Sequence, residues 1–172
     1  MLSLSDNEFS VISFLVRNFA ERLTIRSIAQ KLGFSPAGVF NILKKLEKQG
    51  IVYGQKLGTG LFYSINFESR IACHLASIVL LYSDEKTEID AEKLRQAKAA
   101  ILDGKNLLLI IDNVTIPDVS IENADVMAKT EDEFVALLRK KDSQMLKMLQ
   151  NGFVLFGEDK VLELIKKCIA WI

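Results

Sequence analysis

Apolar residues recur at helical spacing near the start of the chain, and this pattern predicts a first helix. Ser5 and Glu8 form a capping box, so the helix is expected to begin at Asp6. Its apolar face consists of Phe9, Val11, Ile12, Leu15, Val16 and Phe19. A helix with one such face must pack against further elements of a core.

Two more helices are predicted directly afterwards, separated by a tight turn. Thr24 can cap a helix over Ile25–Leu32, and Gly33 can take the left-handed conformation that ends it. Ser35 can cap a third helix over 36–49 with Pro36 at its first position. Its inward residues are expected to be Val39, Leu43 and Leu46. Two short helices joined in this way form a helix-turn-helix, whose second helix can enter the DNA major groove.

A hairpin and a further helix complete the first half of the chain. Residues 51–56 and 61–66 are extended runs joined by Leu57-Gly58-Thr59-Gly60, which has turn chemistry. Asn66 can cap a helix over 67–82, whose second half is apolar nearly all round. Such a helix must be covered on more than one side, by the core and by a partner subunit or a second domain. The order of elements predicts a winged helix-turn-helix domain over residues 1–82.

The second half of the chain predicts a small α/β domain, so the fold class is α+β. A polar linker is expected over 83–89 and the second domain over 90–172. Leu107–Ile111 is a continuous apolar run, typical of a strand buried on both faces. The remaining expected elements are helices over 90–102, 130–140, 143–150 and 158–172 and strands over 124–128 and 153–156.

The charge distribution separates these two halves. The chain has 172 residues and no net formal charge. Residues 1–82 hold nine Lys and Arg against five acids, and residues 83–172 hold the remaining thirteen against seventeen, so the halves carry +4 and −4. A basic front half and an acidic back half fit a DNA-binding module joined to another domain.

Few residues in this chain suggest metal or nucleophile chemistry. His74 is the single histidine, and it is expected to serve in packing or capping. Cys73 and Cys168 lie in apolar helical patterns, which indicates buried thiols in a reducing cytoplasm. The N-terminus lacks the pattern of a signal peptide, and the longest apolar run is too short to span a membrane. We therefore expect a soluble cytoplasmic protein without cofactor or bound metal.

Residues predicted to contact DNA come from three elements. Outward positions early in the third helix face base edges, where Asn41 suits adenine and Lys44 suits guanine or phosphate. Lysines and an arginine on neighbouring surfaces are expected to contact phosphates, which position a protein without reading sequence. The full set is Arg26, Lys31, Ser35, Ala37, Gly38, Phe40, Asn41, Lys44, Lys45, Lys48, Lys56 and Thr59. Phe40 can instead pack into the core, and the wing around Thr59 has no arginine for a minor groove.

The front half resembles the winged-helix domains of archaeal and bacterial regulators of the multiple-antibiotic-resistance and arsenic-repressor type. The resemblance covers residues 5–82 and is carried by 23–33, 35–46, 50–52 and the wing at 58–60. It implies a DNA-binding transcription regulator. The modest number of basic residues on the wing favours a homodimer that binds two half-sites.

The back half is similar to the C-terminal part of minimal nucleotidyltransferase domains, which archaeal proteins often carry behind a winged helix. Residues 130–134 and 151–157 carry this resemblance. Such enzymes need a Gly-Ser loop after the first strand and an Asp-x-Asp pair for two metal ions. Asp112-Asn113 follows the strand here, and Asp112, Asp118 and Asp125 form no such pair. The resemblance therefore implies a degenerate copy without catalytic residues.

The leading prediction is a homodimeric DNA-binding transcription regulator whose α/β domain serves in dimerisation or binds a small-molecule effector of unknown identity. Two alternatives stay open from the sequence. One is a nucleotidyltransferase that acts on protein, tRNA or an antibiotic. The other is an adaptor whose winged helix contacts protein or RNA instead of DNA.

Overall fold

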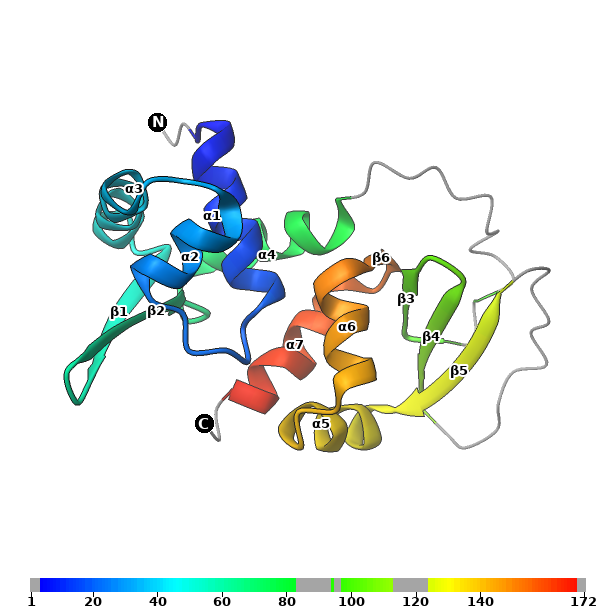
Figure 1. Ribbon diagram of the computed structural model, residues 1–172. Helices are drawn as coiled ribbons and strands as arrows, with labels where there is room; N and C mark the ends of the chain where they lie inside the picture. The colour runs from blue at the N-terminus through cyan, green and yellow to red at the C-terminus, as the bar shows by residue number, and fades with distance from the viewer. Residues whose placement is uncertain (1–3, 83–93, 95–96, 113–123, 170–172) are drawn as a thin grey trace. The chain divides into compact units, whose positions relative to one another are not determined.

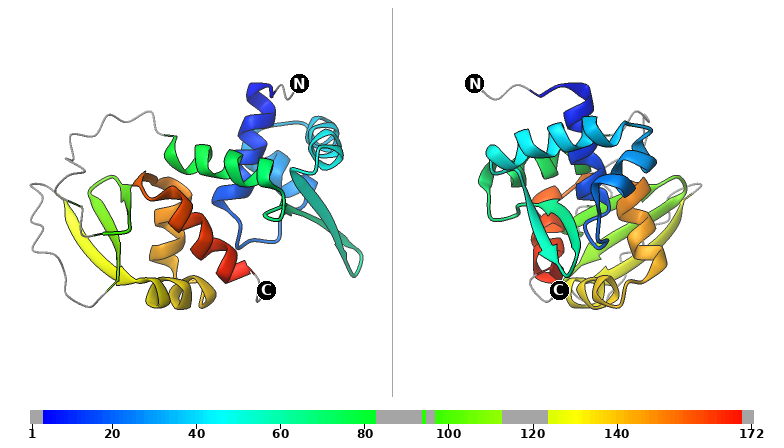
Figure 2. Two further views of the ribbon diagram at one scale, coloured as in Figure 1. Left: turned by 180° about the vertical axis from the view of Figure 1, so that it is seen from behind. Right: turned by 60° about the vertical axis from the view of Figure 1, so that its left-hand side comes forward.

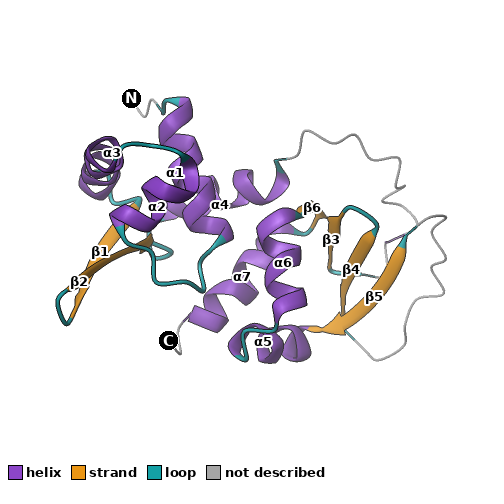
Figure 3. Cartoon of the chain, in the orientation of Figure 1, coloured by secondary structure: helices purple, strands orange, loops and turns teal. Residues whose placement is uncertain are grey.

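The computed structural model describes residues 4–82, 94, 97–112 and 124–169 and divides the chain into two compact units, Met1–Val79 and Leu80–Ile172 (Figure 1). Helices and strands are mixed along the chain, which confirms the α+β class (Figure 3). We call the two parts the N-terminal unit and the C-terminal unit. The first contains α1(Asp6–Arg17), α2(Ile25–Leu32), α3(Pro36–Lys48), β1(Val52–Leu57), β2(Gly60–Ile65) and most of α4(Arg70–Leu81).

Local capping fixes where the first three helices begin and where α2 ends, as predicted. The Ser5 hydroxyl accepts the Glu8 N–H while the Glu8 carboxylate accepts the Ser5 N–H at 2.8 Å. Thr24 forms the equivalent box with Ser27 at the start of α2. Gly33 ends α2 with φ of 70°, a left-handed conformation that residues with a Cβ rarely adopt. These helices meet in a core that includes Ile12, Leu15, Ile28, Leu43 and Leu46, each almost fully buried.

The predicted hairpin is the wing of the N-terminal unit. β1 and β2 pair antiparallel from Val52↔Ile65 to Leu57↔Gly60, with Gly58 and Thr59 as a two-residue turn. Gly58 has φ of 60°, as the first central residue of a type II′ turn requires. Lys56 lies one residue from the end of β1 and so near the tip of the wing.

Helix α4 begins at Arg70, three residues later than the predicted start. Asn66 does not cap it, because its side chain accepts the Glu68 N–H at 3.2 Å and donates to the Gly50 carbonyl at 3.0 Å, which holds a turn before the helix. The Ala72 N–H donates to the Ser69 hydroxyl, which takes the capping position instead. The helix buries Ala72, Ala76, Val79 and Leu80, as expected for a helix packed on the winged-helix core.

A mixed four-stranded sheet forms the centre of the C-terminal unit. Its order is β5-β4-β3-β6, from β3(Ala99–Asp103), β4(Asn106–Ile111), β5(Asp125–Thr130) and β6(Phe153–Phe156). β3 pairs antiparallel with both β4 and β6, and β4 pairs parallel with β5. The predicted strands at 107–111, 124–128 and 153–156 are confirmed within a few residues.

The predicted helix over 90–102 is wrong at its C-terminal end, because residues 99–102 belong to β3. Pairing with two neighbouring strands overrides the helix propensity of Ala99 and Ala100, which are both fully buried in the sheet. Residues 90–93 and 95–96, the predicted linker over 83–89, and Asp118 lie outside the described residues.

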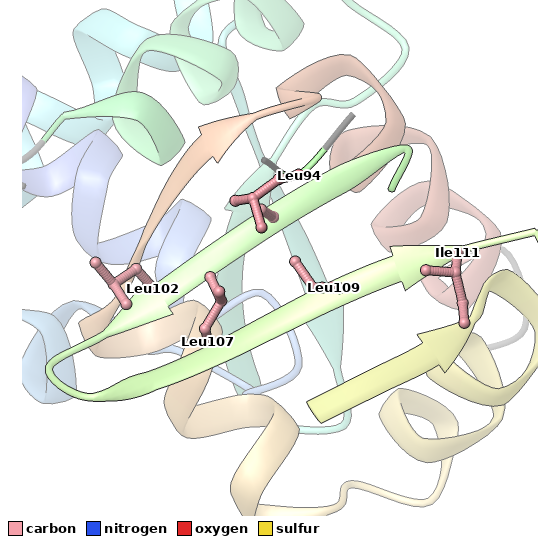
Figure 4. Close-up of a cluster of buried hydrophobic side chains, with 6 residues drawn as sticks. Leu94, Leu102, Leu107, Leu109 and Ile111 are labelled. Atoms are coloured by element: carbon pink, nitrogen blue, oxygen red, sulfur yellow. The ribbon is translucent and has the colours of Figure 1, made fainter. Parts of the chain in front are cut away.

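Both faces of the sheet are apolar, as predicted for the strand over Leu107–Ile111. One face carries Leu102, Leu107, Leu109 and Ile111, which form a buried cluster with Leu94 and Ala100 (Figure 4). The other face is covered by α5(Glu131–Arg139), α6(Ser143–Asn151) and α7(Glu158–Ile169) (Figure 2). All three helices were predicted, and the capping box of Thr130 and Glu133 starts α5. The last predicted residues, 170–172, are not described.

Two glycines bound β6 and allow it to lie close to β3. A Cβ on Gly152 would stand 2.5 Å from the Leu102 carbonyl oxygen, and a Cβ on Gly157 would stand 2.2 Å from that of Lys98. Both positions therefore require glycine for close backbone approach.

Among the described residues, no helix is long and apolar enough to cross a membrane. Cys73 and Cys168 are both free thiols, but only Cys168 is fully buried. Cys73 is half-buried and donates to the Phe67 carbonyl at 3.2 Å, so the expectation of two buried thiols is wrong for Cys73.

Candidate nucleic-acid interface

The outward face of α3 presents the side chains that the sequence predicts for base contacts. Ala37, Phe40, Asn41 and Lys44 are exposed on α3, and Ser35 is exposed at its cap. The Ser35 hydroxyl accepts the Gly38 N–H at 3.1 Å, which fixes the start of the helix, and Gly38 itself is half-buried. On the opposite side Val39, Leu43 and Leu46 are fully buried. The helix is thus held by its apolar side and offers its polar side to a ligand.

Phe40 lies on the exposed face and not in the core. Its side chain is 43% exposed, which decides against the alternative that it packs inward. The Lys44 ammonium lies 6.0 Å from the centre of its ring, at the outer limit of a cation–π contact. An exposed aromatic ring at this position can contact a thymine methyl group.

Lys44 is also tied to the last turn of its own helix. Its ammonium donates to one Glu47 carboxylate oxygen at 2.9 Å, while the other oxygen accepts the Gly54 N–H at 3.2 Å. The hydrogen bond from Lys44 lowers the pKa of Glu47 and raises that of Lys44. Glu47 therefore connects α3 to β1 of the wing.

Lys45 has an intramolecular partner that sequence reasoning did not foresee. Its ammonium lies 2.6 Å from Glu8, whose side chain is 6% exposed. The hydrogen bond from Lys45, followed by that from the Ser5 N–H, holds the pKa of Glu8 below its usual value against the opposing effect of burial. The pair joins α3 to the first turn of α1. Lys45 thus has a structural role besides its predicted phosphate contact.

The remaining predicted residues are exposed and carry no salt bridge to any described residue. Arg26 and Lys31 lie at the two ends of α2, Lys48 is the last residue of α3, and Lys56 and Thr59 lie near or at the tip of the wing. Free ammonium and guanidinium groups of this kind are suited to phosphate contacts. The structure thus brings the predicted residues of α3 onto one helix face and adds charged groups from α2 and the wing.

Three polar residues that the sequence interpretation did not select lie in this surface or behind it. Glu8 and Glu47 were missed, although the Lys44–Glu47 spacing of three is a recognisable helical ion pair. The Tyr63 hydroxyl is buried near Glu47 without a hydrogen-bond partner among the described residues, and burial raises its pKa. Glu8 and Tyr63 support the interface from inside, whereas Glu47 is partly exposed beside Lys44.

The described residues offer little to catalysis or metal binding. No group of three His, Cys, Asp or Glu side chains among them could hold a metal ion. His74 is exposed on α4, so it does not pack in the core as the sequence led us to expect. In the C-terminal unit, Glu131 lies 2.7, 3.4 and 3.7 Å from Lys98, Lys160 and Lys167. Asp112 and Glu163 are the other acidic partners of these lysines, so three positive charges meet three negative ones. This cluster is a neutral ion-pair network.

Comparison with known proteins agrees with the geometry of the N-terminal unit. Residues 2–58 match the model of the MarR family, so the N-terminal part of the chain is similar to the winged-helix domains of that family. No curated protein matches the chain. This confirms the resemblance to regulators of the multiple-antibiotic-resistance type.

Three solved structures are similar to part of the chain. The zinc-responsive MarR family member ZitR of Lactococcus lactis is 26% identical with a TM-score of 0.37, and the match covers 44% of this chain and 50% of that one. A double mutant of the same ZitR protein is 24% identical with a TM-score of 0.37, and the match covers 44% of this chain and 49% of that one. CymR (YrzC), the global cysteine regulator of B. subtilis, is 17% identical with a TM-score of 0.35, and the match covers 54% of this chain and 78% of that one. The chain therefore spans about half the length of the ZitR structures it matches.

Proposed function

We propose that the protein is a transcription regulator whose N-terminal unit binds double-stranded DNA through the exposed face of α3. The observation that carries this proposal is the arrangement of Phe40, Asn41 and Lys44 on the solvent side of a helix whose other side is fully buried. The match of residues 2–58 to the MarR family supports it, because that family consists of DNA-binding regulators. Asn41 reads bases, Lys44 contacts a guanine or a phosphate, and the other predicted cations contact phosphates.

Fluorescence anisotropy tests this function with the full chain. The upstream region of the protein's own gene is compared with a random duplex at about 150 mM salt, near physiological ionic strength. We expect the upstream duplex to bind more tightly than the random duplex. Equal binding would exclude a sequence-specific regulator of this gene.

Two substitutions separate base reading from phosphate contact. Asn41→Ala is expected to weaken binding by about 1–3 kcal/mol and to relax the base preference at one position. Lys48→Ala is expected to weaken all duplexes alike and to reduce the salt dependence by about one contact. Lys147→Ala is the matched control, because this lysine is exposed on α6 of the C-terminal unit.

We further propose that the regulator is a homodimer that pairs through α4. The exposed side of this helix carries Ile71, Ile78 and Leu81 together with His74, and the exposed Tyr82 follows its last residue. The spacing of three, four and seven residues matches the seam of paired helices. A single copy offers a wing without arginine, so a second copy that binds an adjacent half-site would supply the missing contacts.

Sedimentation of the wild type and of Ile78→Asp tests the dimer. We expect the wild type to sediment as a dimer and the variant as a folded monomer with weaker binding to the upstream duplex. A wild type that is monomeric at micromolar concentration, or a variant that remains a dimer, would refute α4 as the interface.

A protein- or RNA-binding adaptor is the second candidate, and the outer side of the wing favours it. Tyr53 and Leu57 are 42% and 38% exposed there, and Phe40 is exposed on α3. Aromatic side chains of this kind stack on the unpaired bases of RNA. Competition of single-stranded RNA against duplex DNA in the same anisotropy assay separates the two candidates.

We propose that the C-terminal unit, which contains the predicted domain over 90–172, does not catalyse nucleotidyl transfer. β3 and β4 are joined by Gly104 and Lys105 alone, which leaves no room there for a phosphate-binding Gly-Ser loop. The similarity to nucleotidyltransferase domains, the archaeal affiliation and the cytoplasmic location stay predictions. Incubation with labelled ATP and magnesium tests the enzymatic alternative, and transfer of label to any acceptor would revive it.

A further inference from the structure

Glu47 serves two different elements with its two carboxylate oxygens. It lies in the last turn of α3, and its side chain is 34% exposed. One oxygen accepts the backbone N–H of Gly54 on β1, and the other accepts the ammonium of Lys44 on the exposed face of α3. The same carboxylate is thus connected both to the wing and to a predicted DNA-contacting side chain.

The wing depends on groups outside the hairpin to hold it in place. Gly54 pairs with Tyr63 across the hairpin, and the N–H groups of both residues point away from the partner strand. The Tyr63 N–H donates to the Leu23 carbonyl at 2.8 Å, and the Gly54 N–H donates to Glu47. Each strand of a two-stranded hairpin has one outer edge without a partner strand, and here one backbone N–H on each outer edge donates to a group outside the hairpin.

Gly54 permits this arrangement because it has no side chain. A Cβ there would stand 3.1 Å from the Tyr63 ring, 3.2 Å from the Glu47 carboxylate and 3.3 Å from Leu61. All three distances are tighter than ordinary contacts, so a side chain at this position would require Tyr63, Glu47 or Leu61 to shift by a few tenths of an ångström. Close packing around Gly54, as well as the charge of Glu47, therefore supports the hydrogen bond between them.

Two partners, Glu47 and DNA, compete for the Lys44 ammonium. It lies one turn after Phe40 on the face that meets DNA, and in the free protein it is paired with Glu47. A phosphate or a guanine edge attracts the same ammonium, and its departure leaves Glu47 bonded to Gly54 alone.

We propose that Glu47 is a positioning residue that fixes the wing against the recognition helix and holds Lys44 until DNA takes it over. This inference rests on the proposed binding of duplex DNA. Glu47 thus has two roles. Its hydrogen bond with the Gly54 N–H holds the wing, which we call the wing bracket, and its ion pair with Lys44 is released when DNA binds. The two roles respond differently to two substitutions of Glu47.

Glu47→Gln and Glu47→Ala separate the two roles. Glutamine can still accept the Gly54 N–H but cannot pair with the Lys44 charge, whereas alanine removes both interactions. Both variants remove one negative charge, so Glu68→Gln serves as the matched control, since Glu68 is exposed just before α4. The assays are anisotropy titrations at about 50 and 200 mM salt, on the preferred duplex and on random duplex. The preferred duplex is the upstream region or, failing that, the tightest binder selected from a random library.

We expect Glu47→Gln to bind every duplex more tightly and with a steeper salt dependence. Without Glu47 the ammonium of Lys44 is not neutralised before binding, so its full charge counts toward the phosphate contact, and one such charge increases the loss of affinity between these salt concentrations by about 3.5-fold. We expect Glu47→Ala to lose about tenfold in its preference for the selected duplex, the effect of one misplaced contact, while Glu47→Gln keeps that preference. Glu68→Gln should change neither quantity. An unchanged salt dependence in Glu47→Gln would refute the release of Lys44, and equal preferences in the two variants would refute the wing bracket.

Hydrogen exchange of the Gly54 amide, measured by NMR on the free full-length protein, tests the bracket without DNA. Glu47→Ala should accelerate this exchange by at least about tenfold, and Glu47→Gln should leave it near the wild-type rate. If the wild type binds no duplex at all, the proposed function fails, and the amide alone then decides for or against the bracket. Equal protection in both variants would overturn it.

Discussion

Replacement of Lys45 by alanine distinguishes a structural role of this lysine from the phosphate contact that the sequence predicts. The Glu8 carboxylate is nearly buried, and its two oxygens are held by the Lys45 ammonium at 2.6 Å and by the Ser5 N–H at 2.8 Å. Lys45→Ala removes the first of these and leaves a buried carboxylate oxygen without its cation. The substitution should therefore destabilise the N-terminal unit.

The size of this effect follows from the exposure of the two partners. A hydrogen bond to a charged group contributes about 1.5–3 kcal/mol, whereas an exposed ion pair contributes about 0.2–1 kcal/mol. The Lys45 side chain is 49% exposed and Glu8 only 6%, so solvent screens one side of the pair. We expect the free energy of unfolding to fall by about 1 kcal/mol at neutral pH, with a coupling of similar size in a double-mutant cycle with Glu8→Gln.

The pH dependence has a definite sign. The pKa of Glu8 in the folded protein lies below its ordinary value of 4.5, first because of the hydrogen bond from Lys45. The stabilisation is therefore fully present above pH 4.5 and is lost as the pH falls through the lower folded pKa. Wild type and Lys45→Ala should differ at neutral pH and converge in acid.

Urea denaturation followed by tyrosine absorbance measures this effect in the N-terminal unit, because two of the three tyrosines, Tyr53 and Tyr63, lie in it. Lys48→Ala is the control, since Lys48 has no salt bridge to a described residue; it should leave stability unchanged and weaken DNA binding. A Lys45→Ala variant of wild-type stability, whose affinity for DNA has lost about one phosphate contact in its salt dependence, would refute the structural role.

Three further substitutions test the packing and charge of the two units. Leu43→Ala on the fully buried side of α3 should lower the unfolding free energy of the N-terminal unit by about 2–5 kcal/mol in urea denaturation, and a loss below about 1 kcal/mol would contradict its place in the core. Tyr63→Phe removes a buried hydroxyl that has no partner among the described residues, so the same assay should show a gain of about 1 kcal/mol, and a loss would reveal a bound water. Glu131→Gln should destabilise the C-terminal unit above pH 4.5 and have little effect in acid, because the hydrogen bond from Lys98 lowers the pKa of Glu131. The fluorescence of Trp171, the single tryptophan of the chain, measures unfolding of this unit. A destabilisation independent of pH would argue against the ion-pair network.

Local signals account for what the sequence predicted well. The caps at Ser5, Thr24 and Thr130 act within three residues, and Gly33 ends α2 by its own backbone conformation. Such features depend on neighbouring residues alone, so they can be recognised without the fold. The helical phase of α3 likewise placed Asn41 on its exposed face.

Contacts between distant residues account for what the sequence did not predict. β3 is a strand because it pairs with β4 and β6, although Asp103-Gly104 between two apolar runs is a recognisable hairpin signal. The pairs of Lys45 with Glu8 and of Glu47 with Gly54 join separate elements. Charge patterns along one helix can predict the partner of Lys44 but not those of side chains that reach another element.

The two glycines at the ends of β6 have a consequence for how the C-terminal unit folds. A strand of four residues has few backbone hydrogen bonds, but Gly152 and Gly157 each fit against a carbonyl of the β3 segment at opposite ends. Any shift of β6 by one residue would bring a side chain into one of these carbonyls, so the misregistered pairings open to most short edge strands are excluded here. β6 can therefore join the sheet in a single register, and this edge should open and close as one cooperative step.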